Sequence, residues 1–483
     1  MNEKGSSERV KKPSIGMALV PVLFMIVSLA VGIAVYDADP HVPLLLSTIV
    51  AAIIAVRLGH SWKSIEASMI KTIGLALQAV LILMIIGSII GSWIAGGIVP
   101  TMIYYGLEIV SPVYYLLAAC VISCVVSLAA GNAWSAAGTI GIALMGIGQG
   151  LGIPLPMVAG AIISGVYFGD KMSPLSETTN LAPAVVGVEL FDHIRNMVYT
   201  TVPALVIALL LYWFLGFKYF GQGSDLSNVA LIQGVLSEEF VISPFLLIPP
   251  LLVVAMLVFK IPAIPGLMAG SIVGALCAVF VQGIPVEEAI AAMHTGFTIQ
   301  TGLDMTDELL NQGGIESMMS TIALVLIAMS FGGVLEKAKI LEVIVKFVLR
   351  GVRKTGSLIA STVATCFASN CVGCEQYMSL VIPGRMYLNE YKQRGLHPKV
   401  LSRTLEDAGT MTSPLIPWTT CGMFMFAVLG VHAFAYAPYA FLAYISPLIA
   451  LVYGYLNIKI DRLPAGAEEG TVLADSNELV QAK

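Results

Sequence analysis

The chain has 483 residues, of which 57% are hydrophobic and only 11% are charged, and its formal net charge at pH 7 is −5. Soluble proteins carry roughly 25% charged residues, so this composition excludes a soluble globular protein and predicts a protein embedded in the lipid bilayer. The sequence contains no basic tract suited to nucleic acid and no phosphate-binding Gly-Lys-Ser/Thr motif. A nucleic-acid partner and an ATP-driven pump are therefore not expected.

Apolar stretches long enough to cross a bilayer recur along the chain. A transmembrane helix needs about 20 apolar residues, and the first such stretch covers residues 15–35, after a short basic segment. It is long and lacks a small-residue cleavage site, so we interpret it as a retained first span and not as a signal peptide. We count about seven hydrophobic segments in each half, and some of them could be re-entrant hairpins.

Loop charges predict which ends of these segments face the cytoplasm. Lys and Arg are enriched in cytoplasmic loops, and residues 57–71, 336–354 and 385–403 are rich in both. Residues 284–316 contain six acidic residues and no Lys or Arg, and the segment 218–240 has one Lys and three acidic residues. We therefore expect the first three segments to be cytoplasmic and the last two to be external.

The two halves of the chain resemble each other. Gly169-Asp-Lys-Met-Ser-Pro-Leu175 and Gly409-Thr-Met-Thr-Ser-Pro-Leu415 share a pattern 240 residues apart. The loop before the third span is basic in the first half and acidic in the second, so equivalent loops are predicted on opposite sides of the membrane. This arrangement is typical of inverted-topology repeats, in which the substrate binds near the midplane between the halves.

The predicted fold is an all-α polytopic membrane protein made of two inverted-topology repeats with broken helices. Its expected organisation is a cytoplasmic N-terminal tail (1–14), a first transmembrane repeat (15–217), an external linker (218–240), a second transmembrane repeat (241–458) and a cytoplasmic C-terminal tail (459–483).

The first polar segment within apolar surroundings runs from residue 164 to residue 180. Pro174 disfavours helix at Ser173 and removes a backbone donor, so the helix should break there. A broken helix persists at membrane depth only where it lines a cavity, and carboxylate, hydroxyl and amide oxygens suit Na⁺. The alternative is an interfacial loop capped by Ser-Pro and Asp. The candidate ligands are Asp170, Ser173, Ser176, Glu177, Thr178, Thr179 and Asn180.

The second copy of this pattern contributes the candidates Asp407, Thr410, Thr412 and Ser413. Burial favours the protonated form of a carboxyl group, and a bound cation favours the ionised form. We therefore expect at least one of Asp170 and Asp407 to bind Na⁺ and a proton in turn. The alternatives are structural ion pairs, of Asp170 with Lys171 and of Asp407 with Arg403 four residues earlier.

A further polar interruption occurs earlier in each half, at Asn132 and at Asn370 with Glu375. These side chains could supply ligands to the same site from a facing element. The alternative explanation is that the small residues around them permit close helix packing.

With these motifs the chain resembles the NhaC-type Na⁺/H⁺ antiporters of bacteria, from about residue 15 to residue 460. The segments that carry the resemblance are Gly169-Asp-Lys-Met-Ser-Pro-Leu-Ser-Glu-Thr-Thr-Asn-Leu-Ala182, Phe191-Asp-His-Ile194, Leu401-Ser-Arg-Thr-Leu-Glu-Asp-Ala-Gly-Thr410 and Ser413-Pro-Leu-Ile-Pro-Trp418. The resemblance implies a scaffold domain and a mobile transport domain, alternating access and a homodimer. The expected transported ions are Na⁺ and H⁺, without a cofactor, and the expected location is the bacterial inner membrane with both termini cytoplasmic.

The sequence thus predicts a secondary Na⁺/H⁺ antiporter and not an enzyme. Some relatives exchange organic acids, taking up malate with protons and expelling lactate with sodium, and this alternative stays open. The absence of an obvious Arg at membrane depth favours cation exchange over small carboxylates. A cation channel would need a continuous pore, which broken helices do not favour, and neither an HExxH nor a Gly-x-Ser-x-Gly motif supports an enzyme.

Overall fold

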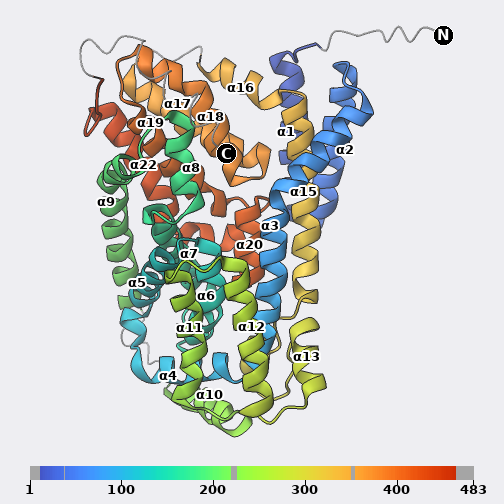
Figure 1. Cartoon of the computed structure of the whole chain (residues 1–483), viewed down its shortest axis with the longest axis vertical. Helices are drawn as coiled ribbons and strands as arrows, with labels where there is room; N and C mark the ends of the chain where they lie inside the picture. Colours follow the sequence, from blue (N-terminus) through green and yellow to red (C-terminus); the bar gives the residue numbers. More distant parts are fainter. Residues whose placement is uncertain (1–10, 37, 219–225, 350–353, 464–483) are drawn as a thin grey trace, which may run out of the picture.

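The computed structural model describes residues 11–36, 38–218, 226–349 and 354–463, and among these residues the only β-pairing is an isolated bridge between Leu396 and Arg462. The helices of the first half are shown in Figure 1. They are α1 (Ile15–Tyr36), α2 (His41–Arg57), α3 (Trp62–Ala95), α4 (Ile98–Ile109), α5 (Pro112–Ala130), α6 (Ala133–Gly150), α7 (Leu155–Met172), α8 (Glu177–Val186) and α9 (Leu190–Phe217).

The second half begins with a helix inside the predicted external linker. Its longer helices are α10 (Leu226–Glu239), α11 (Ile248–Val258), α12 (Ala263–Phe280), α13 (Val286–His294), α14 (Asp304–Leu310), α15 (Met319–Lys337), α16 (Ile340–Leu349), α17 (Thr355–Gly373), α18 (Gln376–Gln393), α19 (Pro398–Leu405), α20 (Thr420–Leu429), α21 (Ala433–Tyr436) and α22 (Phe441–Leu456). Single turns form η1 (Pro244–Leu247), η2 (Glu316–Met318), η3 (Glu406–Thr410), η4 (Ser413–Leu415) and η5 (Ala437–Tyr439).

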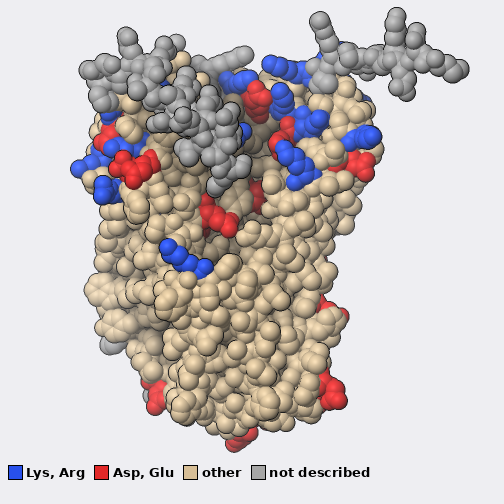
Figure 2. Space-filling model, viewed as in Figure 1, with Lys and Arg blue, Asp and Glu red and all other residues tan. Residues whose placement is uncertain are grey.

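The prediction of a membrane protein is confirmed. Among the described residues, seven helices are long and apolar enough to cross a membrane, and the number rises to ten if each of three bent helix pairs is one crossing. Large apolar side chains such as Val27, Phe214 and Phe280 are exposed on the outer surface, as expected where lipid replaces water. Figure 2 shows most Lys and Arg gathered in the upper part, only a few charged side chains at about half height, and acidic side chains at the lower end.

The basic and acidic segments lie at opposite ends of α3. Just before α3, His60 is near enough to Lys337 and Lys339 for their charges to act on it, so two of the predicted cytoplasmic segments lie close together. Partial burial and then these two ammonium groups lower the pKa of His60. At the other end of α3, the Gly91 backbone approaches α13 so closely that a Cβ atom would lie 1.9 Å from the carbonyl oxygen of Ala292. The inverted orientation of the two repeats remains a prediction.

Two helical hairpins turn at the polar interruptions predicted from the sequence. Gly131 closes α5 with a positive φ of 70°, and the Asn132 side chain caps α6 by accepting from the amides of Trp134 and Ser135 at 2.9 and 3.0 Å. The second turn, at Cys374 and Glu375, joins α17 to α18. Because α17 and α18 lie in the upper part of Figure 1 and α5 and α6 lower down, the two hairpins approach the interior from different ends.

The predicted helix break at Ser173 and Pro174 is confirmed, since α7 ends at Met172 and α8 begins at Glu177. In the second copy, the helical segment that starts with α19 ends at Leu415, directly after Pro414, and bends by 48° relative to α20. Broken helices are therefore present in both halves.

Two expectations about connecting segments are refined by the structure. The loop predicted over 57–71 is wrong beyond Ser61, because the Ser61 side chain accepts a hydrogen bond from the Ser64 amide and starts α3 there. The beginning of the predicted C-terminal tail is not free. The Asp461 carbonyl accepts from the His397 amide at 2.9 Å, and its carboxylate pairs with Lys399 at 2.7 Å. Residues 464–483, 1–10 and 219–225 lie outside the described residues.

Candidate functional site

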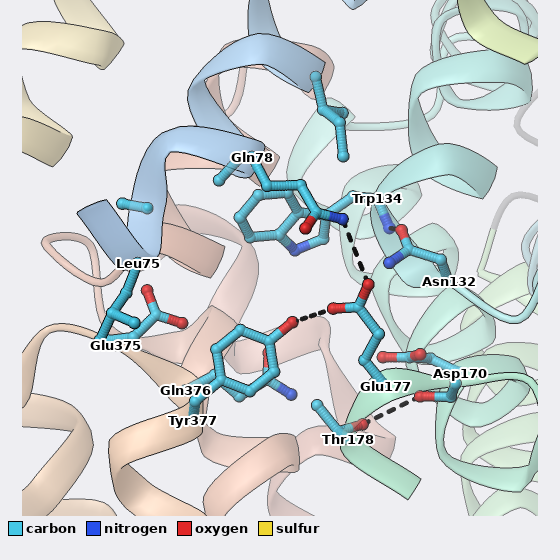
Figure 3. Close-up of a pocket in the computed structure, with 14 residues that line it drawn as sticks. Leu75, Gln78, Asn132, Trp134, Asp170, Glu177, Thr178, Glu375, Gln376 and Tyr377 are labelled. Atoms are coloured by element: carbon cyan, nitrogen blue, oxygen red, sulfur yellow. Dashed lines mark hydrogen bonds between the residues drawn. The ribbon is translucent and has the colours of Figure 1, made fainter. Parts of the chain in front are cut away.

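A pocket with a cavity of about 70 Å³ lies where both hairpin turns meet the first helix break and the middle of α3 (Figure 3). Its lining consists of Leu75, Ala76, Gln78, Ala79, Ile82, Asn132, Trp134, Asp170, Ser176, Glu177, Thr178, Glu375, Gln376 and Tyr377. Residues from both halves of the chain therefore contribute to one site.

Three acidic side chains of this pocket come from three different helix ends. Asp170 is in the last turn of α7, Glu177 begins α8 and Glu375 precedes α18. Asp170 and Glu375 are only 7% and 5% exposed. Among the described residues that line the pocket there is no Lys or Arg. Low-dielectric walls that bear charges of one sign concentrate counter-ions, so the pocket is suited to a cation.

Hydrogen bonds from two other helices hold the Glu177 carboxylate in place (Figure 3). The Tyr377 hydroxyl on α18 donates to one carboxylate oxygen, and the Gln78 side-chain amide on α3 donates to the other at 3.2 Å. Glu177 therefore connects α8 with α3 and α18. A cation that bound Glu177 would act on all three helices.

Other candidates of the first motif stabilise the broken backbone. The Thr179 hydroxyl donates to the carbonyl oxygens of Asp170 and Lys171 at 3.1 and 3.0 Å. The Asn180 side chain donates to the carbonyls of Pro174 and Ser176 at 2.9 and 2.7 Å. These bonds use carbonyl groups on both sides of the break and so hold the bent backbone in place. Thr179 and Asn180 do not line the pocket, and neither does Ser173, which is buried.

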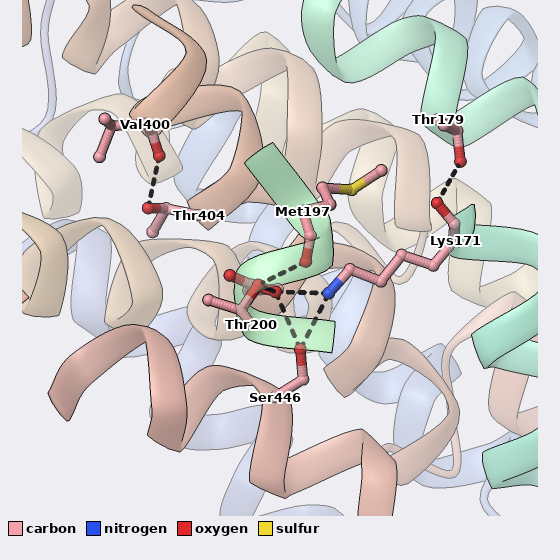
Figure 4. Close-up of polar contacts among 8 residues, drawn as sticks. Lys171, Thr179, Met197, Thr200, Val400, Thr404 and Ser446 are labelled. Atoms are coloured by element: carbon pink, nitrogen blue, oxygen red, sulfur yellow. Dashed lines mark hydrogen bonds and ion pairs between the residues drawn. The ribbon is translucent and has the colours of Figure 1, made fainter. Parts of the chain in front are cut away.

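Asp407 lies outside the pocket, in a fully buried ion pair with Lys171, whose surroundings with Thr200 and Ser446 are shown in Figure 4. The hydroxyls of Thr200 and Ser446 each donate to the same Asp407 oxygen at 2.9 Å, and the Lys171 ammonium also donates to Ser446 at 2.9 Å. The cluster therefore joins α7, α9, η3 and α22.

Both alternative ion pairs suggested by the sequence are wrong. Lys171 pairs with Asp407 and not with Asp170, because successive residues of a helix point to different sides. Arg403 donates to the carbonyl of Lys459 at 3.0 Å and not to Asp407. A π-helical turn begins at Glu406, and it changes the direction expected for a residue four positions after Arg403.

The remaining second-half candidates brace the structure behind the pocket. The Asn370 side-chain amide donates to the Gly409 carbonyl at 2.7 Å and to the Thr412 hydroxyl at 3.0 Å. Thr410 and Ser413 are fully buried, and none of these four residues lines the pocket. The pocket thus gathers six of the predicted site residues: Asn132, Asp170, Ser176, Glu177, Thr178 and Glu375.

Sequence reasoning missed Gln78, Trp134 and Tyr377. Gln78 is an amide within an otherwise apolar span, which was the available signal. Trp134 stacks on Phe424 with ring centroids 4.4 Å apart. No sequence pattern around Tyr377 marked it as a site residue. Its role depends on a hydrogen bond to Glu177, which lies 200 residues away in the sequence.

The chain is similar to several known antiporters. A family model described as the Na⁺/H⁺ antiporter family matches residues 165–458. The chain is 40% identical over 438 residues to the malate-2H(+)/Na(+)-lactate antiporter of Bacillus subtilis. The aligned residues cover 90% of this chain and 94% of that protein. It is 38% identical over 453 residues to the Na(+)/H(+) antiporter NhaC of Alkalihalophilus pseudofirmus, with coverages of 94% and 98%. It is 39% identical over 453 residues to the arginine/ornithine antiporter ArcD of Halobacterium salinarum, with 93% of each covered.

Proposed function

The chain belongs to the Na⁺/H⁺ antiporter family, and on this premise we propose that it exchanges sodium ions for protons across a bacterial plasma membrane. The observation that carries the proposal is the pocket at the first helix break. Its lining includes three carboxyl groups from both halves of the chain and, among the described residues, no basic side chain.

Asp170 is the residue at which we place the exchange. A carboxylate at membrane depth requires a compensating positive charge, and either Na⁺ or a proton supplies it. The hydroxyls of Ser176 and Thr178 line the same pocket and provide neutral oxygens for Na⁺. When Na⁺ binds, the proton leaves Asp170, and when a proton binds, Na⁺ leaves, so the two ions compete for one site.

Lys171 takes no part in this exchange. Its ammonium group is held by Asp407 and Ser446, which keeps a positive charge out of the pocket although Lys171 directly follows Asp170. The proposed role of Asp407 is therefore to hold Lys171, and the cation ligands are the acids of the pocket.

Exchange of organic acids is the second candidate, favoured by the identity of 40% to a malate-2H(+)/Na(+)-lactate antiporter. A dicarboxylate would meet three acidic side chains in the pocket, and its donors would be limited to amides and hydroxyls such as those of Asn132, Gln376 and Tyr377. Like charges at this depth disfavour such a ligand, so we rank cation exchange first.

For transport we propose alternating access in a protein with two inverted repeats, cytoplasmic termini and a homodimeric assembly. The two hairpins and the two broken helices would form the transport domain, which would move against a scaffold that includes α3. The support is the pocket itself, which is lined by side chains of α3 together with side chains of both hairpin turns and of the α7–α8 break.

Purified protein in liposomes tests this function. With an outward proton gradient, we expect saturable uptake of radioactive sodium, accompanied by a change in internal pH. Malate, lactate, arginine and ornithine, added one at a time, should leave the sodium flux unchanged. Sodium flux that occurs only with malate and lactate on opposite sides would favour organic-acid exchange, and flux that does not saturate would favour a channel.

A further inference from the structure

The helices around the pocket form two groups, and the first group contains α3, α12 and α15. The Trp93 indole of α3 donates a hydrogen bond to the Gly270 carbonyl of α12 at 2.9 Å. The Ser68 hydroxyl, also on α3, donates to the Gly333 carbonyl of α15 at 2.9 Å. These hydrogen bonds make α3 part of one body with α12 and α15.

The second group contains α8, α17 and α18. A Cβ atom at Gly384 of α18 would lie 2.7 Å from Cγ1 of Val185, so α8 and α18 are in close contact. The hydroxyls of Thr365 on α17 and Tyr387 on α18 lie 2.8 Å apart and form a hydrogen bond. Because closely packed elements move as rigid bodies and do not deform continuously, these helices should move together.

Glu177 connects the two groups at the pocket (Figure 3). Its carboxylate accepts from the side-chain amide of Gln78 on α3 at 3.2 Å. Its other oxygen accepts from the hydroxyl of Tyr377, which belongs to the same group as Glu177. Among the residues that the structure describes, no other hydrogen bond or ion pair joins α3 to α8 or α18.

The remaining contacts between the pocket helices have no fixed direction. A Cβ atom at Gly138 of α6 would lie 2.5 Å from Cδ1 of Ile86 on α3, which is an apolar contact. Between α15 and α17, a Cβ atom at Gly332 would lie 2.7 Å from the Gly373 carbonyl, so the two backbones meet without interlocking side chains. Such contacts permit sliding, whereas a hydrogen bond requires a set distance and angle.

We propose that the hydrogen bond between Gln78 and Glu177 is a latch, which holds the pocket in the conformation described here and must break before the two groups move. Tyr377 is a positioning residue that orients the Glu177 carboxylate toward Gln78. The inference rests on the proposed function, in which α3 and the helix breaks move against each other during alternating access. Gln78 and Glu177 are exposed to the pocket, so water replaces the broken bond. The latch therefore favours this conformation only modestly, by about fivefold in population.

Distance measurements between two spin labels on the purified full-length protein test this inference. One label replaces Lys71 on α3 and the other replaces Arg385 on α18, both of which are exposed. Genetically encoded keto amino acids carry the labels, so the native cysteines stay unchanged. The wild type should give a main distance for the conformation described here and a minor distance for the moved one. In Gln78→Leu the ratio of the minor to the main population should rise about fivefold, and in Tyr377→Phe it should rise less, because Gln78 still reaches the carboxylate.

Gln233→Leu and Tyr444→Phe are the matched controls. Gln233 on α10 donates to the Tyr104 carbonyl at 3.0 Å, and the Tyr444 hydroxyl on α22 donates to the Pro438 carbonyl at 3.2 Å. Neither Gln233 nor Tyr444 lines the pocket. Each control removes the same type of side-chain donor as its counterpart, and each should keep the wild-type ratio of the two distances.

The latch acts through Glu177, so Gln78→Leu should have no further effect in a Glu177→Ala background. An unchanged ratio in Gln78→Leu, or an equally large effect of Gln78→Leu with and without Glu177, would overturn the inference. If Glu177→Ala does not fold, Gln78→Glu at pH 8 places a second carboxylate beside Glu177. It should then raise the ratio above that of Gln78→Leu, and equal ratios in these two variants would overturn the inference. Absence of sodium-dependent proton movement in wild-type liposomes would instead refute the proposed function without changing these distances.

Discussion

The ammonium group of Lys171 and a carboxylate oxygen of Asp407 form an ion pair in which both side chains are fully buried, although the residues are 236 positions apart in the sequence. Lys171 lies in the last turn of α7, directly before the first helix break, and Asp407 lies in the π-helical turn of the second half. The pair therefore fixes the two irregular segments of the chain relative to each other.

Removing one partner of this pair should be strongly destabilising. Asp407→Asn leaves the Lys171 ammonium buried without a counter-charge, and we expect the free energy of unfolding to fall by about 3–5 kcal/mol. The double variant Lys171→Met with Asp407→Leu should recover much of that loss, because no unpaired charge remains. Chemical denaturation in detergent measures both effects. Equal stability of Asp407→Asn and the wild type would contradict the assignment of a buried ion pair.

Asp170→Asn should leave the protein folded and weaken sodium binding. The substitution keeps the size of the side chain but removes the charge that Na⁺ compensates, so we expect a loss of affinity of about tenfold or more, equivalent to about 1.4 kcal/mol. Sodium-dependent exchange in liposomes measures it as a higher half-saturating concentration or as lost flux. Asp192→Asn, on an exposed acid whose nearest basic partner Arg195 is 3.9 Å away, is the control. Wild-type affinity in Asp170→Asn would remove Asp170 from the site.

Local features of the fold followed from the sequence because their causes are local. An apolar run predicted a first span at 15–35, and α1 occupies Ile15–Tyr36. Proline chemistry placed the break at Ser173 and Pro174. The hairpin turn at Asn132 was visible as a polar interruption, since an Asn side chain can cap the helix that follows.

Which residues come together in the site depends on how distant helices pack, and this packing could not be predicted from local sequence patterns. Asn132 and Asn370 occupy similar positions in the two halves, but Asn132 lines the pocket whereas Asn370 donates to the Gly409 carbonyl. Periodicity does not determine how distant helices are rotated against one another. The partner of Lys171 was missed for the same reason. The two local pairs considered, Asp170 with Lys171 and Asp407 with Arg403, are replaced by a contact between Lys171 and Asp407 across the two halves.

Two glycines of α3 should respond differently to the same substitution. A Cβ atom at Gly91 would lie 1.9 Å from the backbone oxygen of Ala292, whereas at Gly74 no atom lies within 4 Å. Gly91→Ala must therefore push α13 away from α3, and overpacking of this kind costs about 1–3 kcal/mol. Gly74→Ala is the matched control and should not be destabilising. Thermal unfolding in detergent compares the two, and equal midpoints would contradict the close approach of α13.

His60 should titrate below the usual range of a histidine. Burial comes first and the Lys337 and Lys339 ammonium groups second among the causes that lower its pKa. His60 should therefore be neutral at pH 7 and become protonated only as the pH falls below about 6.5, the ordinary value. Replacing both lysines by Gln should raise the midpoint in an NMR titration without restoring the ordinary value, because burial persists. An unchanged midpoint in that variant would separate the loop of His60 from Lys337 and Lys339.

Lys63 and Glu288 should be accessible from opposite sides of the membrane. Lys63 is in the first turn of α3, and α13, which carries Glu288, packs against the other end of that helix. A helix of 34 residues is about 51 Å long at about 1.5 Å per residue, which exceeds the hydrocarbon thickness of about 30 Å. The basic end of α3 should be cytoplasmic. In a variant without native cysteines, a membrane-impermeant maleimide added to intact cells should label Glu288→Cys but not Lys63→Cys, and lysis should expose the latter. Labelling of both variants in intact cells would be incompatible with the proposed topology, because both halves would then present these loops to the same side.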